Sequence, residues 1–171
     1  MKSDYITRAK KFMVSFMPYF ESYKDIRDAV RNYNRDKHRH VEYYHGIARR
    51  CLCLSDYAVK WDYDPEYVDR YGGCEMEMAN YKFACDYGYS YLFAEITQIK
   101  VYGYTFYVMP RITTLAMNAG TGEYNPNERL SCDEYEFVYN TMCLCDLHDE
   151  NWGFLHGEMK IIDYANTHRE E

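Results

Sequence analysis

The sequence predicts an α+β protein, because the spacing of its hydrophobic residues changes from a helical to a strand period along the chain. Apolar residues at helical spacing predict two helices within residues 3–35. From residue 41 onward, short runs rich in β-branched and aromatic residues predict five strands, with one helix between the third and the fourth. A chain of 171 residues can bury roughly 70% of its unfolded surface, so a sizeable core is expected.

The two N-terminal helices each carry one apolar stripe, and Pro18 is expected to separate them. Ser22, followed three residues later by Asp25, predicts the start of the second helix. The polar, basic stretch 34–40 is interpreted as a solvated connector, with an anion-binding segment as the alternative. We expect these helices to pack on the rest of the protein rather than to contact a partner.

The first three strands are predicted at residues 41–45, 48–54 and 57–61, where they form a small antiparallel meander. A polar loop is expected at 62–73. The good helix formers at 74–87 then predict a single helix.

The remaining strands are predicted at residues 94–101 and 104–109, as a hairpin that ends at Pro110, where a backbone donor is lost. Residues 113–130 are interpreted as a loop or a broken helix because they contain Gly and Pro. One more helix is predicted at 132–141.

The composition disfavours several classes of protein. Twenty Lys and Arg against 27 Asp and Glu give a net charge of -7, so general nucleic-acid binding is not expected. The seven Cys, an odd number without zinc-type or Cys-x-x-Cys spacing, indicate reduced thiols in a cytoplasmic protein. Neither a secretory signal nor an apolar run long enough to span a membrane is seen, so no membrane partner is expected. The 21 Tyr suit half-buried and contact surfaces but indicate no function.

Three oxygen-bearing side chains near the C-terminus carry the clearest chemical signal. Asp146 and Asn151 share a predicted loop, and Asp163 follows at the end of a strand-like run. Phosphoryl transfer requires such a set: one carboxylate orients the attacking hydroxyl, while an amide and a second carboxylate hold Mg²⁺ against the triphosphate.

In this segment the sequence resembles the protein kinase superfamily. Its Asp-Leu-His-x-x-Asn motif, residues 146–151, is closest to that of aminoglycoside-phosphotransferase-like kinases and of short kinase-like proteins from lytic bacteriophages. The resemblance implies that Asp146 is the catalytic-loop aspartate and that Asn151 is a metal ligand. It also implies that Asp163, in Asp-Tyr-Ala, is the metal-binding aspartate of an Asp-Phe-Gly-type motif.

Two further residues extend the resemblance in the right chain order. Lys60, at the end of an Ala-Val-Lys run on the third strand, matches the lysine that pairs the α- and β-phosphates. Glu77 on the next helix matches the carboxylate that positions this lysine, with Glu75 as the alternative. A strand Lys or a helical Glu on its own indicates only an exposed side chain, so the order of the elements carries this interpretation.

The resemblance also implies a nucleotide site between two lobes. Met109 is expected as the gatekeeper, and Pro110 and Ile112 in the hinge segment that reads the adenine edge. Gly46 stands where kinases carry a glycine-rich loop over the phosphates. His148 is interpreted either as a γ-phosphate contact or as a hydrogen-bonded loop residue.

By this resemblance, residues 1–40 are an N-terminal helical extension, 41–112 a kinase-like N-lobe with a five-stranded antiparallel sheet and one helix, and 113–171 a truncated helical C-lobe. The sequence departs from the family pattern in two ways. A single glycine replaces the G-x-G-x-x-G loop, and the sequence stops soon after Asp163, without an activation segment or a platform for peptide substrates.

We therefore expect an ATP- and Mg²⁺-dependent phosphotransferase, a minimal phage-type Ser/Thr protein kinase that acts on host proteins in the host cytoplasm. The alternative is a kinase-fold binding protein that inhibits a host enzyme or defence complex and holds nucleotide as a structural ligand. A small-molecule kinase is disfavoured, because the acceptor pocket of the aminoglycoside branch is built from large-lobe helices. The acceptor and the oligomeric state are left open.

Overall fold

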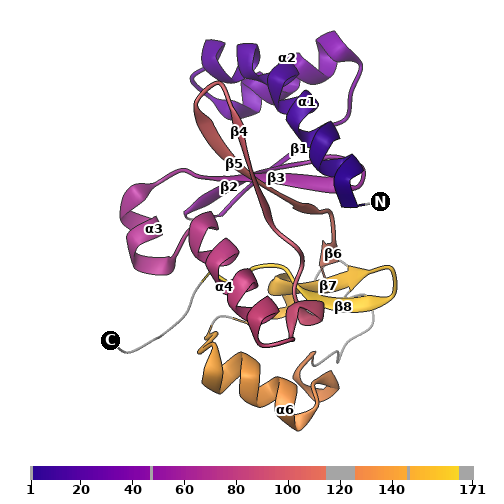
Figure 1. The fold of residues 1–171 in the computed structure, drawn as a ribbon. Helices are drawn as coiled ribbons and strands as arrows, with labels where there is room; N and C mark the ends of the chain where they lie inside the picture. The colour runs from indigo at the N-terminus through magenta and orange to yellow at the C-terminus, as the bar shows by residue number, and fades with distance from the viewer. Residues whose placement is uncertain (1, 47, 115–125, 146, 166–171) are drawn as a thin grey trace.

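The computed structural model describes residues 2–46, 48–114, 126–145 and 147–165. It is a mixed α+β structure in which two N-terminal helices lie above a five-stranded antiparallel sheet, with a small sheet and a further helix below (Figure 1). The N-terminal helices are α1 (Lys2–Ser22) and α2 (Ile26–Lys37). The strands of the large sheet are β1 (Glu42–His45), β2 (Arg49–Cys53), β3 (Tyr57–Asp62), β4 (Thr97–Val101) and β5 (Tyr104–Pro110).

The large sheet has the spatial order β1-β2-β3-β5-β4, and every neighbouring pair is antiparallel. The predicted five strands are therefore confirmed, although the fourth begins at Thr97 rather than at residue 94. The helix α4 (Cys74–Asp86) connects β3 to β4, as predicted from the sequence. In the register of the sheet, Lys60 lies between Cys51 of β2 and Tyr107 of β5.

The side chains of the sheet alternate between two different environments, because successive residues of a strand point to opposite faces. In β3, Tyr57, Val59 and Trp61 belong to the core that the sheet shares with the N-terminal helices. Ala58 and Lys60 point to the other face, where they line cavities. One face of the sheet thus packs on the N-terminal helices, and the other carries Lys60 among smaller hydrophobic clusters.

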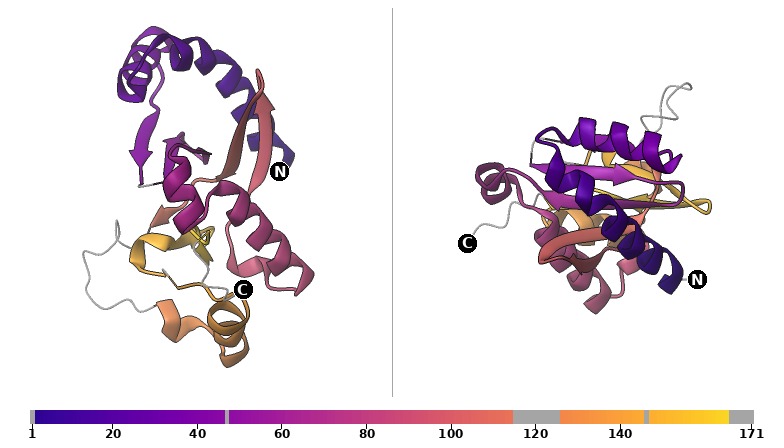
Figure 2. Two further views of the ribbon diagram at one scale, coloured as in Figure 1. Left: turned by 90° about the vertical axis from the view of Figure 1, so that its left-hand side faces the viewer. Right: turned by 90° about the horizontal axis from the view of Figure 1, so that it is seen from above.

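The N-terminal helices cover the packing face, as the view from above shows (Figure 2). Phe16 of α1 is fully buried, and its ring centroid lies 5.3 Å from that of Tyr33 in α2. Phe20 reaches the sheet, with ring centroids 5.8 Å from Trp61 and 6.2 Å from Phe106. The expectation that these helices pack on the protein is confirmed, since they supply much of the core.

The predicted helix break at Pro18 is wrong, because Pro18 lies inside α1. Pro18 costs this helix one hydrogen bond, to the carbonyl of Val14, a residue on the exposed side of α1. The chain turns only at residues 23–25, and Asp25 caps α2 by accepting a hydrogen bond of 2.8 Å from the backbone N–H of Arg27. Ser22 instead donates to the carbonyl of Pro18.

The predicted polar loop at 62–73 is also wrong in part, because it contains the short helix α3 (Pro65–Tyr71). Asp64 caps this helix by accepting from the N–H of Glu66 at 3.1 Å, and Pro65 is its first residue. An Asp followed by Pro is a helix-start signal that the polar composition of the segment concealed.

The small sheet consists of β6 (Thr113–Thr114), β7 (Trp152–Leu155) and β8 (Glu158–Ile161), all antiparallel. The helix α6 (Cys132–Tyr135) continues as the π-helical turn η3 (Glu136–Thr141), which matches the extent of the predicted helix. Residues 113–130 were interpreted as a loop or a broken helix. In this stretch the structure describes the two-residue strand β6 and the short 3-10 helix η2 (Pro126–Arg129). Residues 115–125 lie outside the described residues.

The second core joins this lower part to the sheet above. Its largest fully buried members are Trp152 and Tyr164, which pack together with residues of α4 and η3. Among the helices that the structure describes, none is long and apolar enough to cross a lipid bilayer.

Replacing Phe16 by Ala should destabilise the whole protein, because its buried ring joins α1 to α2 and the cavity left behind cannot collapse fully. We expect the free energy of unfolding to fall by about 3–5 kcal/mol. Urea unfolding followed by circular dichroism measures this loss. Val14→Ala, an exposed change on the same helix, is the control and should cost less than about 0.5 kcal/mol. Equal small losses in both variants would show that the helices are a dispensable extension.

Candidate functional site

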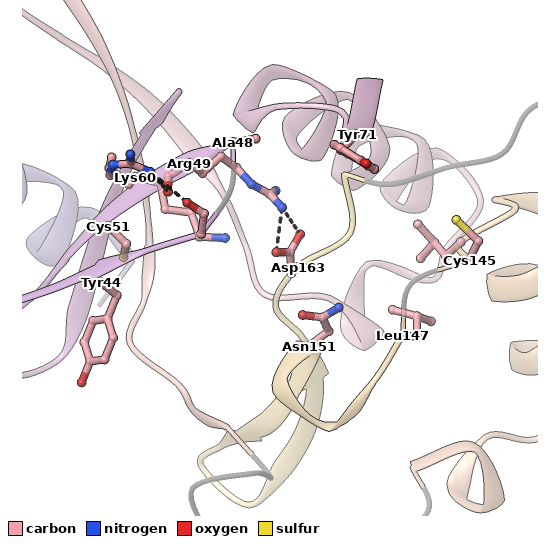
Figure 3. A pocket seen from close by; sticks show the side chains of 13 residues that line it. Tyr44, Ala48, Arg49, Cys51, Lys60, Tyr71, Cys145, Leu147, Asn151 and Asp163 are labelled. Atoms are coloured by element: carbon pink, nitrogen blue, oxygen red, sulfur yellow. Dashed lines mark hydrogen bonds and ion pairs between the residues drawn. The ribbon is translucent and has the colours of Figure 1, made fainter. Parts of the chain in front are cut away.

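Two adjoining cavities lie beside the face of the large sheet that carries Lys60, where it meets the segments around Asn151 and Asp163. Figure 3 shows side chains that line the larger of the two. The larger cavity has a volume of about 620 Å³ and is lined by Gly46, Arg49 and Lys60 from the sheet side. The smaller has about 390 Å³ and shares Lys60, Asn151 and Asp163 with the larger. The two cavities thus meet at a group of charged and polar side chains.

The smaller cavity has a mainly apolar wall on its far side. Met109 is buried, and it forms a small hydrophobic cluster with Ala58 and Ala94. Pro110 and Ile112, from the segment that leads from β5 to β6, also line this cavity. The structure therefore brings Met109, expected as the gatekeeper, to the same cavity as Pro110 and Ile112, which were expected in the hinge segment. Gly46 lines the larger cavity only.

The hinge segment is fastened to the sheet by Arg111. Its guanidinium donates to the carbonyl of Leu54 at 2.9 Å and to the carboxylate of Glu42 at 2.8 Å. The backbone N–H of Arg111 donates to the carbonyl of Asp56 at 3.0 Å. These three bonds anchor the segment between β5 and β6, which connects the large sheet to the small sheet.

Lys60 of β3 and Glu77 of α4 form the ion pair that was expected from their order in the sequence. The Nζ atom of Lys60 lies 3.1 and 3.2 Å from the two carboxylate oxygens of Glu77, and it also donates to the carbonyl of Ile162 at 3.1 Å. Glu77 is fully buried, whereas Glu75, the alternative partner, is exposed on the same helix.

Arg49, which sequence reasoning missed, adds a second cation to this pair. Its Nη2 atom lies 2.6 and 2.7 Å from the two carboxylate oxygens of Asp163, and its Nη1 atom lies 2.9 Å from Oε1 of Glu77. Arg49 precedes Cys51, the register partner of Lys60, by two residues. The period-2 alternation of a strand therefore puts Arg49 on the same face as Lys60, which was the available signal.

The pKa values of the four charged groups, Arg49, Lys60, Glu77 and Asp163, are shifted by burial and by the charges of the other members. Burial lowers the pKa of Lys60, but the carboxylates of Glu77 and Asp163 outweigh this effect and raise it above its usual value. Burial raises the pKa of Asp163, but the neighbouring Arg49 and Lys60 reverse this and hold it below its usual value. The pKa of Glu77 is raised because its complete burial outweighs both cations.

The backbone on either side of Asp163 is fixed by buried hydrogen bonds. The N–H of Ile162 donates to the carbonyl of Asn151 at 2.9 Å. The hydroxyl of Tyr164 donates to the carbonyl of Ala94 at 2.6 Å, and the side-chain amide of Asn80 donates to the carbonyl of Tyr164 at 2.6 Å. Asp163 is therefore held between α4 and the small sheet.

Of the three residues predicted to converge for catalysis, the structure brings two together. Asn151 is buried, and both Asn151 and Asp163 line both cavities. Asp146 lies outside the described residues. The imidazole Nδ1 of His148 accepts from the N–H of Glu150 at 3.3 Å, so His148 is a hydrogen-bonded loop residue, and the walls described for the two cavities do not include it.

The two cavities together offer cations to an anionic group and an apolar surface to a ring, since Arg49 and Lys60 line the larger one and Met109 and Ile112 line the smaller. The amide oxygen of Asn151 and the carboxylate of Asp163 are oxygen donors of the kind that Mg²⁺ prefers. No group of three or more His, Cys, Asp or Glu suited to a metal occurs in the described part of the chain. The carboxylate of Asp163 is engaged by Arg49.

Replacing Glu77 by Gln should strongly destabilise the protein, because Arg49 and Lys60 would then share the single carboxylate of Asp163. Breaking a buried ion pair in this way costs about 3–5 kcal/mol. Urea unfolding at neutral pH measures the difference. Glu75→Gln, on the exposed side of the same helix, should cost less than about 0.5 kcal/mol. If the two variants lose the same stability, the buried cluster contributes nothing specific.

Replacing Asp163 by Asn should weaken the dependence of stability on acid pH. The pKa of Asp163 in the folded protein is below its ordinary value, so its ionised form stabilises the fold above that value. This stabilisation is lost as the pH falls through the lower folded-state pKa, and the Asn variant cannot lose it. Unfolding free energies between about pH 5 and about pH 2 should therefore change less in the variant than in the wild type. Asp28→Asn, an exposed change, should retain the wild-type slope.

No protein-family model matches this chain, and no curated protein matches it in sequence. The chemistry of the site is therefore inferred from its own geometry: two partly buried cations and two carboxylates where two cavities meet.

Proposed function

We propose that the protein is an ATP- and Mg²⁺-dependent phosphotransferase of the protein kinase-like type. The observation that carries this proposal is the ion pair between Lys60 of β3 and Glu77 of α4, at a cavity that Asn151 and Asp163 also line. These residues come from distant parts of the sequence, and their resemblance to kinase motifs was drawn from the motifs and their order along the chain. Their meeting at one cavity supports the proposal independently of that order.

The fold supports a kinase-like N-lobe. Five antiparallel strands with one long helix between the third and the fourth are the elements that the resemblance implies. The loop before β7 carries Asn151, and Asp163 follows β8, so one hairpin brings the two oxygen donors to the same place.

The two cavities suit the two ends of ATP. The adenine ring would lie against Met109 and Ile112, with its edge toward the backbone of the hinge segment. The phosphates would face the cations of Lys60 and Arg49 in the larger cavity. Mg²⁺, held by Asn151 and Asp163 when bound, would neutralise charge on the triphosphate.

The protein's own residues contribute mainly by positioning. Glu77 holds Lys60 at the wall of the cavity, where its ammonium would meet a phosphate oxygen in exchange for its bond to the carbonyl of Ile162. By the resemblance, Asp146 would accept the proton of the attacking hydroxyl. Holding the reactants in line accounts for most of the acceleration in this kind of reaction.

The acceptor that we propose is a Ser or Thr hydroxyl of a host protein, in keeping with the phage-type form of the catalytic motif. A second candidate, a kinase-fold protein that binds and inhibits a host target, is favoured by the exposed tyrosines. Such rings make large contact areas at protein interfaces. They include Tyr63, which is 61% exposed, Tyr87, at 58%, and Tyr102, at 68%.

Transfer of label from γ-labelled ATP tests the proposal, with Mg²⁺ and with bacterial lysate as the source of acceptors. Lys60→Met should lower transfer by about 100-fold or more, because a preorganised cation on the phosphates is lost. Asp146→Asn should abolish transfer while nucleotide binding persists. Lys100→Met, on the exposed side of β4, is the matched control and should leave transfer unchanged.

Nucleotide binding without any label transfer by the wild type would reject the enzyme and favour the inhibitor. A wild type that binds no nucleotide at all would reject both forms of the proposal.

A further inference from the structure

Arg49 occupies the oxygen atoms of Asp163 that a metal ion would need. Both carboxylate oxygens accept from the Nη2 atom of Arg49, at 2.6 and 2.7 Å. A guanidinium and a divalent cation on the same two oxygens would repel each other. A metal ion bound to Asp163 would therefore weaken its pairing with Arg49.

The other contacts of the cluster allow Arg49 to leave. Glu77 retains both of its contacts with Lys60, so it stays paired without Arg49. The Nη1 atom of Arg49 lies 2.9 Å from Glu77 but makes no hydrogen bond, although it is buried. Asp163, in contrast, would lose its closest cation. Lys60 does not take the place of Arg49, because its ammonium donates to Glu77 and to the carbonyl of Ile162.

The position of Arg49 also favours movement of its side chain toward the cavity. Arg49 is the first residue of β2, and its side chain is 18% exposed in the wall of the larger cavity. Gly46 of the same β1–β2 turn is the single glycine in the place of a phosphate-binding loop. A guanidinium beside this turn offers the planar pair of donors that phosphate oxygens accept.

We propose that Arg49 is an exchangeable counter-ion of the site. It pairs with Asp163 in the ligand-free protein and transfers to the phosphates of the nucleotide when Asp163 turns to a divalent cation. This inference rests on the proposed function. It explains how a turn with one glycine can hold a triphosphate, and it makes binding of metal and of nucleotide interdependent.

The charge balance of the cluster gives the exchange its direction. Arg49 and Lys60 balance Glu77 and Asp163 in the ligand-free state. A divalent cation alone would leave an excess of buried positive charge, which is costly. The phosphates of a nucleotide remove this excess, and Arg49 then exchanges one anion for another.

Binding of Mn²⁺ alone, and of a non-hydrolysable ATP analogue with Mn²⁺, tests the exchange by calorimetry. Arg49→Ala should bind Mn²⁺ alone at least about tenfold more tightly than the wild type, because the competing cation is gone. The same variant should bind the analogue at least about tenfold more weakly. Arg31→Ala removes an exposed arginine of α2 and should behave as the wild type in both measurements.

Two further variants keep the result decisive. Arg49→Lys retains the cation without the planar fork, so it should keep the fold and still bind the analogue more weakly than the wild type. Asp163→Asn, combined with Arg49→Ala, should remove the gain in Mn²⁺ affinity. Circular dichroism on every variant confirms that the fold is retained.

Parallel weakening of Mn²⁺ and analogue binding in Arg49→Ala, or no change in either, would overturn the exchange while leaving the proposed function intact. Absence of analogue binding by the wild type would instead overturn the proposed function, and with it the transfer of Arg49 to phosphate. A gain in Mn²⁺ affinity that disappears with Asp163→Asn would still support the pairing of Arg49 with the metal-binding carboxylate.

Discussion

The packing of four charged side chains, Arg49, Lys60, Glu77 and Asp163, between the sheet, α4 and the segment after β8 constrains the rest of this structure. Glu77 has no contact with solvent, so it must be compensated by the cations of Lys60 and Arg49. Arg49, Lys60 and Glu77 come from β2, β3 and α4. An arrangement that separated these elements would leave the buried carboxylate unpaired, and the two cavities form where the elements meet.

The N-terminal helices supply hydrophobic packing that offsets the cost of holding charged side chains inside the protein. The aromatic side chains of α1 and α2 fill one face of the sheet, so stability does not depend on the other face being apolar. That second face can then carry lysine, arginine and cysteine side chains beside open space. A sheet of this size covered on neither side would be marginal, because small sheets need a hydrophobic face packed against another element.

The sequence predicted the sheet, α4 and the pairing of Lys60 with Glu77, because each rests on local periodicity or on the order of elements. The prediction at Pro18 is wrong because a proline rule applied in isolation takes no account of the packing of α1, whose residues on both sides of Pro18 belong to the core. Arg49 was missed for a different reason. Its partner Asp163 lies more than a hundred residues away, and only the folded chain brings the two together.

The alternation along β2 has a consequence for the register of this strand. Arg49 faces the cavity, whereas its neighbour Arg50 stacks on Tyr63, with the guanidinium carbon 3.7 Å from the ring centroid, beside the helices. Pairing β2 with its neighbours one residue out of register would exchange the two faces of the strand and send Leu52 out of the core. The hydrophobic residues of β2 therefore fix the place of Arg49 in the cavity, although Arg49 itself is not part of the core.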